Sequence, residues 1–220
     1  MKSLTKEEQT LITPSRALQK LKNGNKRFME NLMVNRNLLQ QVNETSEGQF
    51  PFAAILSCID SRTSAELIFD QGLGDIFSIR IAGNILNKDI LASMEFACKV
   101  AGSKLVLVLG HTKCGAIAGA CNNVQMGNLT SLLEKVKPAI KMEGETSQQK
   151  ENDSEYVNHV TVNNIFLVAK EIKERSEILK EMAENGEIRI VGGLYDVETG
   201  KVDFFEEEEI EDFFSKDDPS

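Results

Sequence analysis

Two cysteines and one histidine stand where they could share a metal ion. Cys58 follows the apolar run 52–56, and His111 and Cys114 follow the apolar run 105–109. Ligands bind at the carboxyl ends of buried parallel strands, so these side chains could meet in one crevice. The two residues between His111 and Cys114 allow one tight turn to aim both side chains at a single ion. Two thiolates and one imidazole suit zinc, and three protein ligands leave the fourth tetrahedral position open, as in a catalytic site.

Each of these three residues also has a simpler explanation. Taken singly, buried cysteines are most often small apolar core residues, and a loop histidine is most often satisfied by local hydrogen bonds. A structural zinc site is usually closed by a fourth cysteine or histidine, and the sequence offers none in a suitable place. We interpret Cys98 and Cys121 as core thiols. A redox dithiol is disfavoured because the sequence has no C-x-x-C pair.

A carboxylate and a guanidinium stand just beyond Cys58, at Asp60 and Arg62. Arginine can hold a carboxylate in bidentate geometry and keep it ionised. Asp60 could then accept a proton from metal-bound water, or it could occupy the open metal position itself, and these two roles exclude each other. The simpler alternative is an ion pair that only fixes the loop.

The hydrophobic pattern predicts the elements that must position these residues. Thr13-Pro14 is typical of a helix start, and the apolar runs alternate with helical segments, which favours parallel pairing with right-handed crossovers. We expect an α/β fold: a central, mostly parallel β-sheet flanked by helices, with an N-terminal helical arm. The predicted strands are 52–56, 76–80, 105–109, 188–195 and 202–204, and the predicted helices are 64–69, 89–100, 116–121, 129–141 and 157–183, with a polar loop at 143–152.

Size and composition indicate one domain. The 220 residues are 41% hydrophobic and 27% charged, which is ordinary for a globular protein. We expect a single domain over 1–205, including a helical arm at about 1–45, followed by an acidic C-terminal tail at 206–220 that is solvated and poorly ordered. The net charge of -9 disfavours nucleic-acid binding.

No apolar run approaches the roughly 20 residues that span a bilayer, and the first residues lack the apolar stretch of a secretory signal. We therefore expect no membrane partner and a cytoplasmic location. A signal peptide removed beforehand would leave the same appearance and would indicate the periplasm instead.

Two motifs resemble those of a known enzyme family. Cys58-Ile59-Asp60-Ser61-Arg62 and Gly110-His111-Thr112-Lys113-Cys114-Gly115 are similar to the paired signatures C-x-D-S-R and G-H-x-x-C-G of beta-class carbonic anhydrases. The resemblance begins in the opening helix, at 21–28, continues through 80–84 and reaches the closing strand.

The resemblance implies a role for each matching residue. Cys58, His111 and Cys114 would bind zinc, Asp60 and Arg62 would form the catalytic dyad, and Asp60 would become a fourth ligand in a closed, acidic state. The residues implied to contact the substrate, as in the plant-like branch, are Gln49, Phe77, Ala82, Phe96 and Gly115. Phe96 stands where that branch often has tyrosine, so one hydroxyl is missing. The chain has no tryptophan, so the bicarbonate inhibition of the other branch is not expected.

The implied reaction is the reversible hydration of carbon dioxide to bicarbonate and a proton through zinc-bound hydroxide. Two rival functions keep the site: hydrolysis of carbonyl sulfide or carbon disulfide, and zinc binding without turnover. Family members are typically dimers or tetramers with the active site partly formed at the subunit interface, so a homodimer or homotetramer is expected. His159 lies in the predicted helix 157–183 and is interpreted as a surface or interface residue rather than a proton shuttle.

Overall fold

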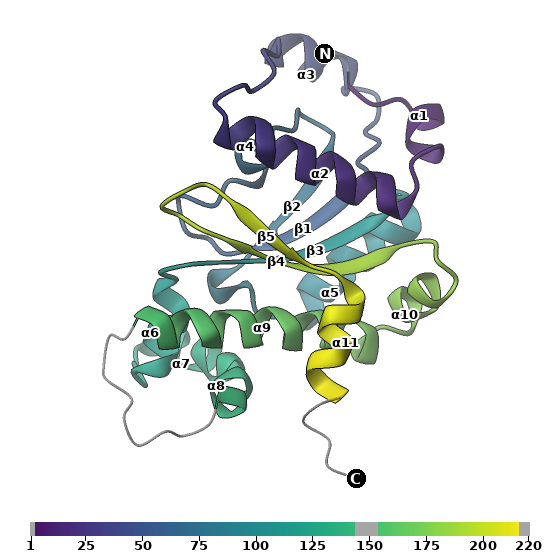
Figure 1. Cartoon of the computed structure of the whole chain (residues 1–220). Coiled ribbons are helices and arrows are strands. Elements are labelled where there is room, and N and C mark those ends of the chain that lie inside the picture. The colour runs from purple at the N-terminus through teal and green to yellow at the C-terminus, as the bar shows by residue number, and fades with distance from the viewer. Residues whose placement is uncertain (1–2, 144–153, 216–220) are drawn as a thin grey trace.

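A five-stranded sheet forms the centre of the molecule (Figure 1). The computed structural model describes residues 3–143 and 154–215. The strand order is β2-β1-β3-β4-β5, and every neighbouring pair is parallel except β4 and β5. The predicted α/β fold is thus confirmed. The strands are β1 (Ala53–Ser57), β2 (Ile76–Arg80), β3 (Leu105–His111), β4 (Arg189–Tyr195) and β5 (Val202–Phe205).

The two central strands are buried along their whole length, which explains their continuous apolar sequences. The helices α2 and α4 cover one face of the sheet, and α5, α9 and α10 cover the other (Figure 1). A third apolar cluster lies under α6, α7 and α8 and includes Cys58 and Cys114. The helices are α1 (Lys6–Thr10), α2 (Pro14–Met29), α3 (Leu38–Glu44), α4 (Ala65–Ile68), α5 (Lys88–Glu95), α6 (Gly115–Cys121), α7 (Gly127–Leu133), α8 (Lys137–Glu143), α9 (Ser154–Arg175), α10 (Glu177–Glu184) and α11 (Glu207–Ser215), with short turns η1 (Ala82–Asn84), η2 (Phe96–Val100) and η3 (Glu134–Val136).

Two long predicted helices are interrupted. The expected helix 157–183 is α9 followed by α10, because Ser176 ends one and caps the other: its hydroxyl accepts a hydrogen bond from the Leu179 amide at 3.2 Å. The expected helix 129–141 is α7, η3 and α8 in succession. Most of the expected loop 143–152 lies outside the described residues. In the predicted helix 89–100, the last turn is a π-helix.

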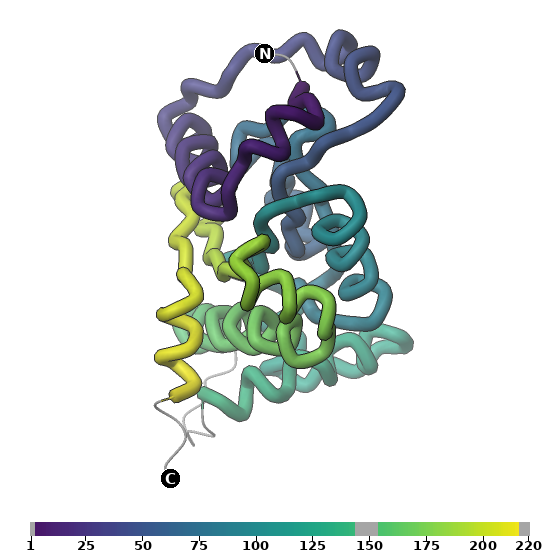
Figure 2. Tube along the Cα trace, turned by 90° about the vertical axis from the view of Figure 1, so that its right-hand side faces the viewer, coloured from purple at the N-terminus to yellow at the C-terminus, as the bar shows by residue number. Residues whose placement is uncertain are grey.

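The N-terminal arm is fastened to the body by a buried carboxylate. Asp70 is fully buried, and it pairs with Arg27 at 2.5 Å and with Arg36. Burial opposes its ionisation, but hydrogen bonds from Arg27 and Arg36 outweigh burial and lower its pKa. Figure 2 shows the arm at one end of the molecule and α11 at the other.

The prediction of a poorly ordered tail is wrong for 207–215, which forms α11. Ile210 is buried, and the Phe213 ring packs 5.0 Å from that of Phe166 on α9. The run of glutamates is typical of a solvated terminus, but the apolar residues that follow it recur at helical spacing. Residues 216–220 lie outside the described part of the chain.

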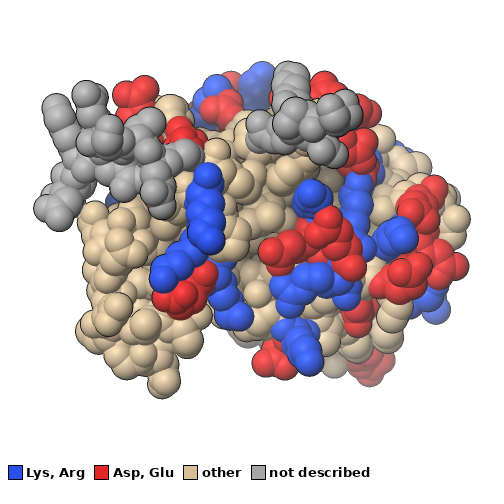
Figure 3. All heavy atoms as spheres, turned by 90° about the horizontal axis from the view of Figure 1, so that it is seen from below, with Lys and Arg blue, Asp and Glu red and all other residues tan. Residues whose placement is uncertain are grey.

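Within the described residues, no helix is both long enough and apolar enough to cross a bilayer. Seen from below, the surface carries acidic and basic side chains intermixed (Figure 3).

Candidate metal centre

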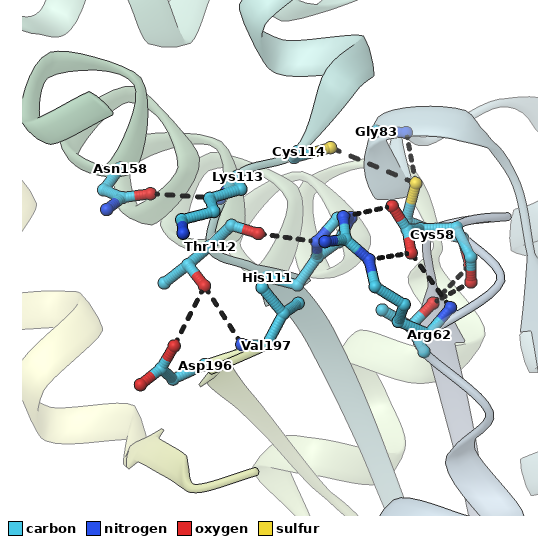
Figure 4. Close-up of polar contacts among 12 residues, drawn as sticks. Cys58, Arg62, Gly83, His111, Thr112, Lys113, Cys114, Asn158, Asp196 and Val197 are labelled. Atoms are coloured by element: carbon cyan, nitrogen blue, oxygen red, sulfur yellow. Dashed lines mark hydrogen bonds and ion pairs between the residues drawn. The ribbon is translucent and has the colours of Figure 1, made fainter. Parts of the chain in front are cut away.

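Three donor atoms from two neighbouring strand ends meet in one buried place. Cys58 follows β1, His111 is the last residue of β3, and Cys114 is the residue before α6. Because β1 and β3 are adjacent and parallel, they end at the same edge of the sheet. The ligand atoms of the three residues lie within 4.8 Å of one another, and the two Sγ atoms are 4.0 Å apart (Figure 4). The juxtaposition expected from the sequence is therefore present.

The imidazole of His111 is oriented for metal binding. Its Nδ1 lies 2.9 Å from the carbonyl oxygen of Thr112, which can only accept, so Nδ1 carries the proton and Nε2 holds a free lone pair. That Nε2 is buried without a hydrogen-bond partner among the described residues. An unpaired buried acceptor is costly, and a metal ion between His111 and the two sulfurs would satisfy it. The donor set of two sulfurs and one imidazole nitrogen fits zinc.

The turn that carries His111 is held from β4 and the residues after it. The Thr112 amide donates to the Tyr195 carbonyl at 2.9 Å, and the Thr112 hydroxyl donates to Asp196 at 3.2 Å and accepts from the Val197 amide at 3.1 Å (Figure 4). Lys113 adopts a left-handed conformation with φ 56°, which produces the tight turn between His111 and Cys114. Both side chains can thus face one point.

The two thiols influence each other strongly. The hydrogen bond from the Cys114 thiol lowers the pKa of Cys58, while sharing that proton with Cys58, together with burial, raises the pKa of Cys114. The Gly83 amide also lies 3.4 Å from the Cys58 sulfur. One sulfur is therefore already disposed to be a thiolate, and a bound cation would favour the same state in the other.

Asp60 and Arg62 form a two-pronged ion pair beside the three donors. The guanidinium donates from Nε to Oδ1 at 2.9 Å and from Nη2 to Oδ2 at 2.8 Å, and the Arg62 amide donates to Oδ1 at 2.9 Å. These hydrogen bonds lower the pKa of Asp60 and keep it ionised. Arg80 supports the loop by donating to the carbonyl oxygens of Cys58 and Asp60.

The residues expected to contact substrate do not all gather around the three donors. Ala82 and Gly115 are chain neighbours of Gly83 and Cys114. Gln49, by contrast, precedes β1, so it lies beyond the opposite end of that strand from Cys58, where it is exposed beside a surface cavity of about 360 Å³.

Phe77 pairs with Ala54 in the early part of the sheet, and its ring contacts that of Phe96 edge-on at 6.3 Å. Phe96 is 54% exposed. Within one chain, then, Gln49, Phe77 and Phe96 form part of the surface rather than of a closed pocket.

The remaining titratable candidates behave as core or surface groups. Cys98 is buried, and burial raises its pKa to about 12. Cys121 is half-buried, and burial raises its pKa as well. His159 is more than half exposed and bonds Glu143 at 3.0 Å.

Several supporting residues were missed from the sequence: Gly83, Arg80, Thr112, Asp196 and Asn164. Most of them act through backbone groups or across long sequence separations, so local spacing carries no signal for them. Arg80 and Gly83 lie in the segment 80–84 and Thr112 lies in the motif 110–115, and both segments carry the family resemblance. Asp196 and Asn164 lie in neither.

Comparisons with known proteins agree with this geometry. The family profile for carbonic anhydrases matches residues 53–202. Carbonic anhydrase 2 of Mycobacterium tuberculosis is 34% identical over 196 residues, covering 86% of this chain and 91% of its own length. The beta-carbonic anhydrase CafA of Aspergillus fumigatus superposes with a TM-score of 0.67 at 25% identity, covering 92% of this chain and 97% of its own.

A structure from a study of two tetrameric beta-carbonic anhydrases of Sordaria macrospora superposes with a TM-score of 0.66 at 25% identity, covering 72% of this chain and 82% of its own. Fold, donor set and sequence similarity point the same way, and the chain belongs to the beta-carbonic anhydrase family.

Proposed function

We propose that this chain is a zinc-dependent carbonic anhydrase that reversibly hydrates carbon dioxide, with Cys58, His111 and Cys114 holding the metal. The observation that carries the proposal is the buried His111 Nε2, which has no hydrogen-bond partner among the described residues, together with the grouping of the ligand atoms of Cys58, His111 and Cys114 within 4.8 Å of one another. Zinc bound to such a set supplies an acidified water and a Lewis acid, a chemistry for which carbonic anhydrases are the familiar example.

The role proposed for Asp60 follows from its ionisation. An ionised carboxylate can only accept hydrogen bonds, so Asp60 would hold the proton of the attacking water toward itself and leave the water's lone pair free for the carbon of carbon dioxide. Arg62 keeps that carboxylate charged and aimed. In the acidic, closed state Asp60 would become the fourth ligand, and it would first have to leave both guanidinium hydrogen bonds.

Stopped-flow measurement of carbon dioxide hydration tests the assignment. The zinc-loaded protein should turn over, and Asp60→Asn, which keeps the size but not the charge, should lose about 10²–10⁴-fold in kcat. Glu66→Gln, a change in a carboxylate on α4, serves as the matched control and should keep its rate. Turnover of carbonyl sulfide or carbon disulfide with no hydration of carbon dioxide would favour the first rival, and zinc binding with no turnover of any substrate would favour the second.

The assembly proposed is a homodimer or a homotetramer in which a second copy completes the substrate pocket. Gln49, Phe77 and Phe96 lie at the surface of the single chain, away from the strand ends that carry the metal donors. A partner subunit could bring its own three residues to this site. The tetrameric relatives from Sordaria macrospora support an assembly of this kind.

We further propose a cytoplasmic location. All four cysteines are free thiols, and two of them would serve as metal ligands, which suits a reducing compartment. Fractionation of cells that make the protein tests this proposal, and recovery in the periplasm would contradict it.

A further inference from the structure

The buried side-chain amide of Asn164 is linked to the metal centre by two hydrogen bonds that share the Gly83 residue. The Gly83 amide donates to the Cys58 sulfur at 3.4 Å (Figure 4), and the Gly83 carbonyl oxygen accepts a hydrogen bond at 3.0 Å from the side-chain amide of Asn164 on α9. A continuous path therefore runs from the middle of a core helix to the sulfur of a proposed ligand.

Gly83 is held in an unusual conformation. Its φ is 66°, in the left-handed region that residues with a Cβ rarely adopt, and the next residue, Asn84, has φ 40°. The turn η1 that contains them has no side-chain cap at its start. Within the turn, the Asn84 amide donates to the Ile81 carbonyl oxygen at 3.0 Å. From outside the turn, Asn164 holds the Gly83 carbonyl oxygen and so helps to orient the Gly83 peptide.

The position of Asn164 is itself fixed by close packing. A Cβ placed on Gly110 of β3 would stand 2.7 Å from Ile165 and 3.0 Å from Thr161, so α9 can approach the strand only because this residue is glycine. Gly110 directly precedes His111. The close packing of α9 against Gly110 therefore also places Asn164 within hydrogen-bonding distance of Gly83.

Within the part of the chain that the structure describes, the side-chain amide of Asn164 is hydrogen-bonded through its nitrogen but not through its oxygen. Asn164 is 1% exposed, and its Oδ1 has no hydrogen-bond partner among the described residues. A buried, unpaired amide oxygen opposes folding, while the amide nitrogen of the same side chain keeps the Gly83 carbonyl oxygen paired. Among the described residues, the one hydrogen bond that this side chain makes is to Gly83, whose amide in turn donates to the Cys58 sulfur.

We propose that Asn164 is a positioning residue for the metal centre: it holds the Gly83 peptide so that its N–H donates to the Cys58 thiolate. This inference rests on the proposed role of Cys58 as a zinc ligand. An N–H hydrogen bond withdraws electron density from a thiolate and fixes the direction of its remaining lone pairs, and such partners of ligands govern metal affinity and electronic structure. The residue touches neither substrate nor metal.

The test compares two neighbouring asparagines of α9. Asn164→Leu removes the amide at similar volume, and Asn163→Leu makes the same change one residue earlier, where the side chain instead donates to Glu143 at 3.0 Å. The cobalt(II)-substituted proteins are compared by their thiolate-to-cobalt absorption, and the zinc-loaded proteins by the rate at which they release zinc to a chelator.

We expect Asn164→Leu to release zinc about 10-fold faster than wild type and to shift the cobalt band, while Asn163→Leu changes neither. Equal behaviour of the two variants would overturn the inference. If Asn164→Leu does not fold, Asn164→Ala is measured in its place, and failure of both to fold would also overturn it, because the residue would then be structural.

The wild-type protein separates this inference from the proposed function. Cobalt binding without a thiolate band would remove Cys58 from the ligand set and with it the basis of both. A normal thiolate band in wild type that is unchanged in the Asn164 variants would reject only the positioning role.

Discussion

Two sulfur atoms 4.0 Å apart in a buried space are difficult to keep ionised without a cation between them. In the absence of a metal, Cys58 and Cys114 share a proton, which lowers the pKa of one and raises that of the other. With a divalent ion both can be thiolates, and His111 supplies a neutral nitrogen whose tautomer is already set by Thr112. At the scale of single residues, the site is therefore prepared for a metal rather than for a disulfide.

Replacement of one cysteine tests whether its sulfur is a zinc ligand. Mutation of a residue that hydrogen-bonds to a metal ligand typically lowers metal affinity by roughly 10–100-fold. Cys58→Ser should lower zinc affinity by more than this, because it removes a ligand itself. Competition with a chromophoric chelator measures the affinity. Cys121→Ser is the control, since this thiol is half-buried on α6 and should leave affinity unchanged; similar losses in both variants would contradict the ligand set.

At the scale of elements, the ion pairs of Asp70 with Arg27 and Arg36 hold the N-terminal arm against the rest of the molecule. Asp70→Asn leaves the buried Arg36 without its counter-charge and should reduce the free energy of unfolding by about 3 kcal/mol near neutral pH. Urea titration measures this loss. Glu47→Gln, at an exposed position after α3, should change little.

The pH dependence of the same comparison has a definite sign. The pKa of Asp70 is lowered in the folded state, so the folded protein binds its proton more weakly than the unfolded chain does. The stabilisation is complete above the unfolded value of about 3.9 and is lost as pH falls through the lower folded value. The difference in free energy of unfolding between wild type and Asp70→Asn should therefore shrink below about pH 4. A difference that grows on acidification would contradict a stabilising role for the ionised Asp70.

The helix α11 offers a second test at this scale. Ile210 is buried between α9 and the sheet, so Ile210→Ala should destabilise the protein by about 2–4 kcal/mol. Glu208→Ala, an exposed change on the same helix, should have a small effect. Thermal unfolding of the two variants distinguishes an ordered α11 from a solvated tail, for which both changes would be equally mild.

The elements differ in how far the sequence could predict them. The strands β1 and β3 were predicted to within two residues at each end, because complete burial demands continuous apolar runs. The edge strand β2 is only partly buried, and its β-branched and aromatic residues still matched the prediction. The break at Ser176 was not, since a serine within a long helical pattern signals a cap only when tertiary contacts bend the chain there. The helix α11 was not predicted, because a run of four glutamates is typical of a solvated terminus, and the apolar face made by Ile210, Phe213 and Phe214 is short.

The metal site shows the same division. Cys58, His111 and Cys114 were predicted because strand ends and short spacing are local features. Gly83 and Asn164 were not, because their contribution is a hydrogen-bonded path between segments far apart in the sequence. The expected substrate residues Gln49, Phe77 and Phe96 were named by resemblance, and their placement relative to the donors depends on assembly rather than on one chain.

At the scale of the whole molecule, a pocket shared between subunits has a measurable consequence. Gln49→Ala and Cys58→Ser should each impair activity in their own assemblies. In a mixed dimer with two-fold symmetry, one site would combine intact ligands from one chain with an intact Gln49 from the other. An equimolar mixture of the two variants, unfolded and refolded together, should therefore recover about a quarter of wild-type hydration activity. If no activity is recovered, the site is not shared in this way: Gln49 either acts in the site of its own chain or does not act in the reaction.

Zinc K-edge X-ray absorption of the zinc-loaded protein identifies the ligand atoms of Cys58, His111 and Cys114 themselves. The spectrum should fit two sulfur scatterers at about 2.3 Å and nitrogen or oxygen scatterers at about 2.0–2.1 Å. A first shell without sulfur, or with four sulfurs, would rule out this ligand set.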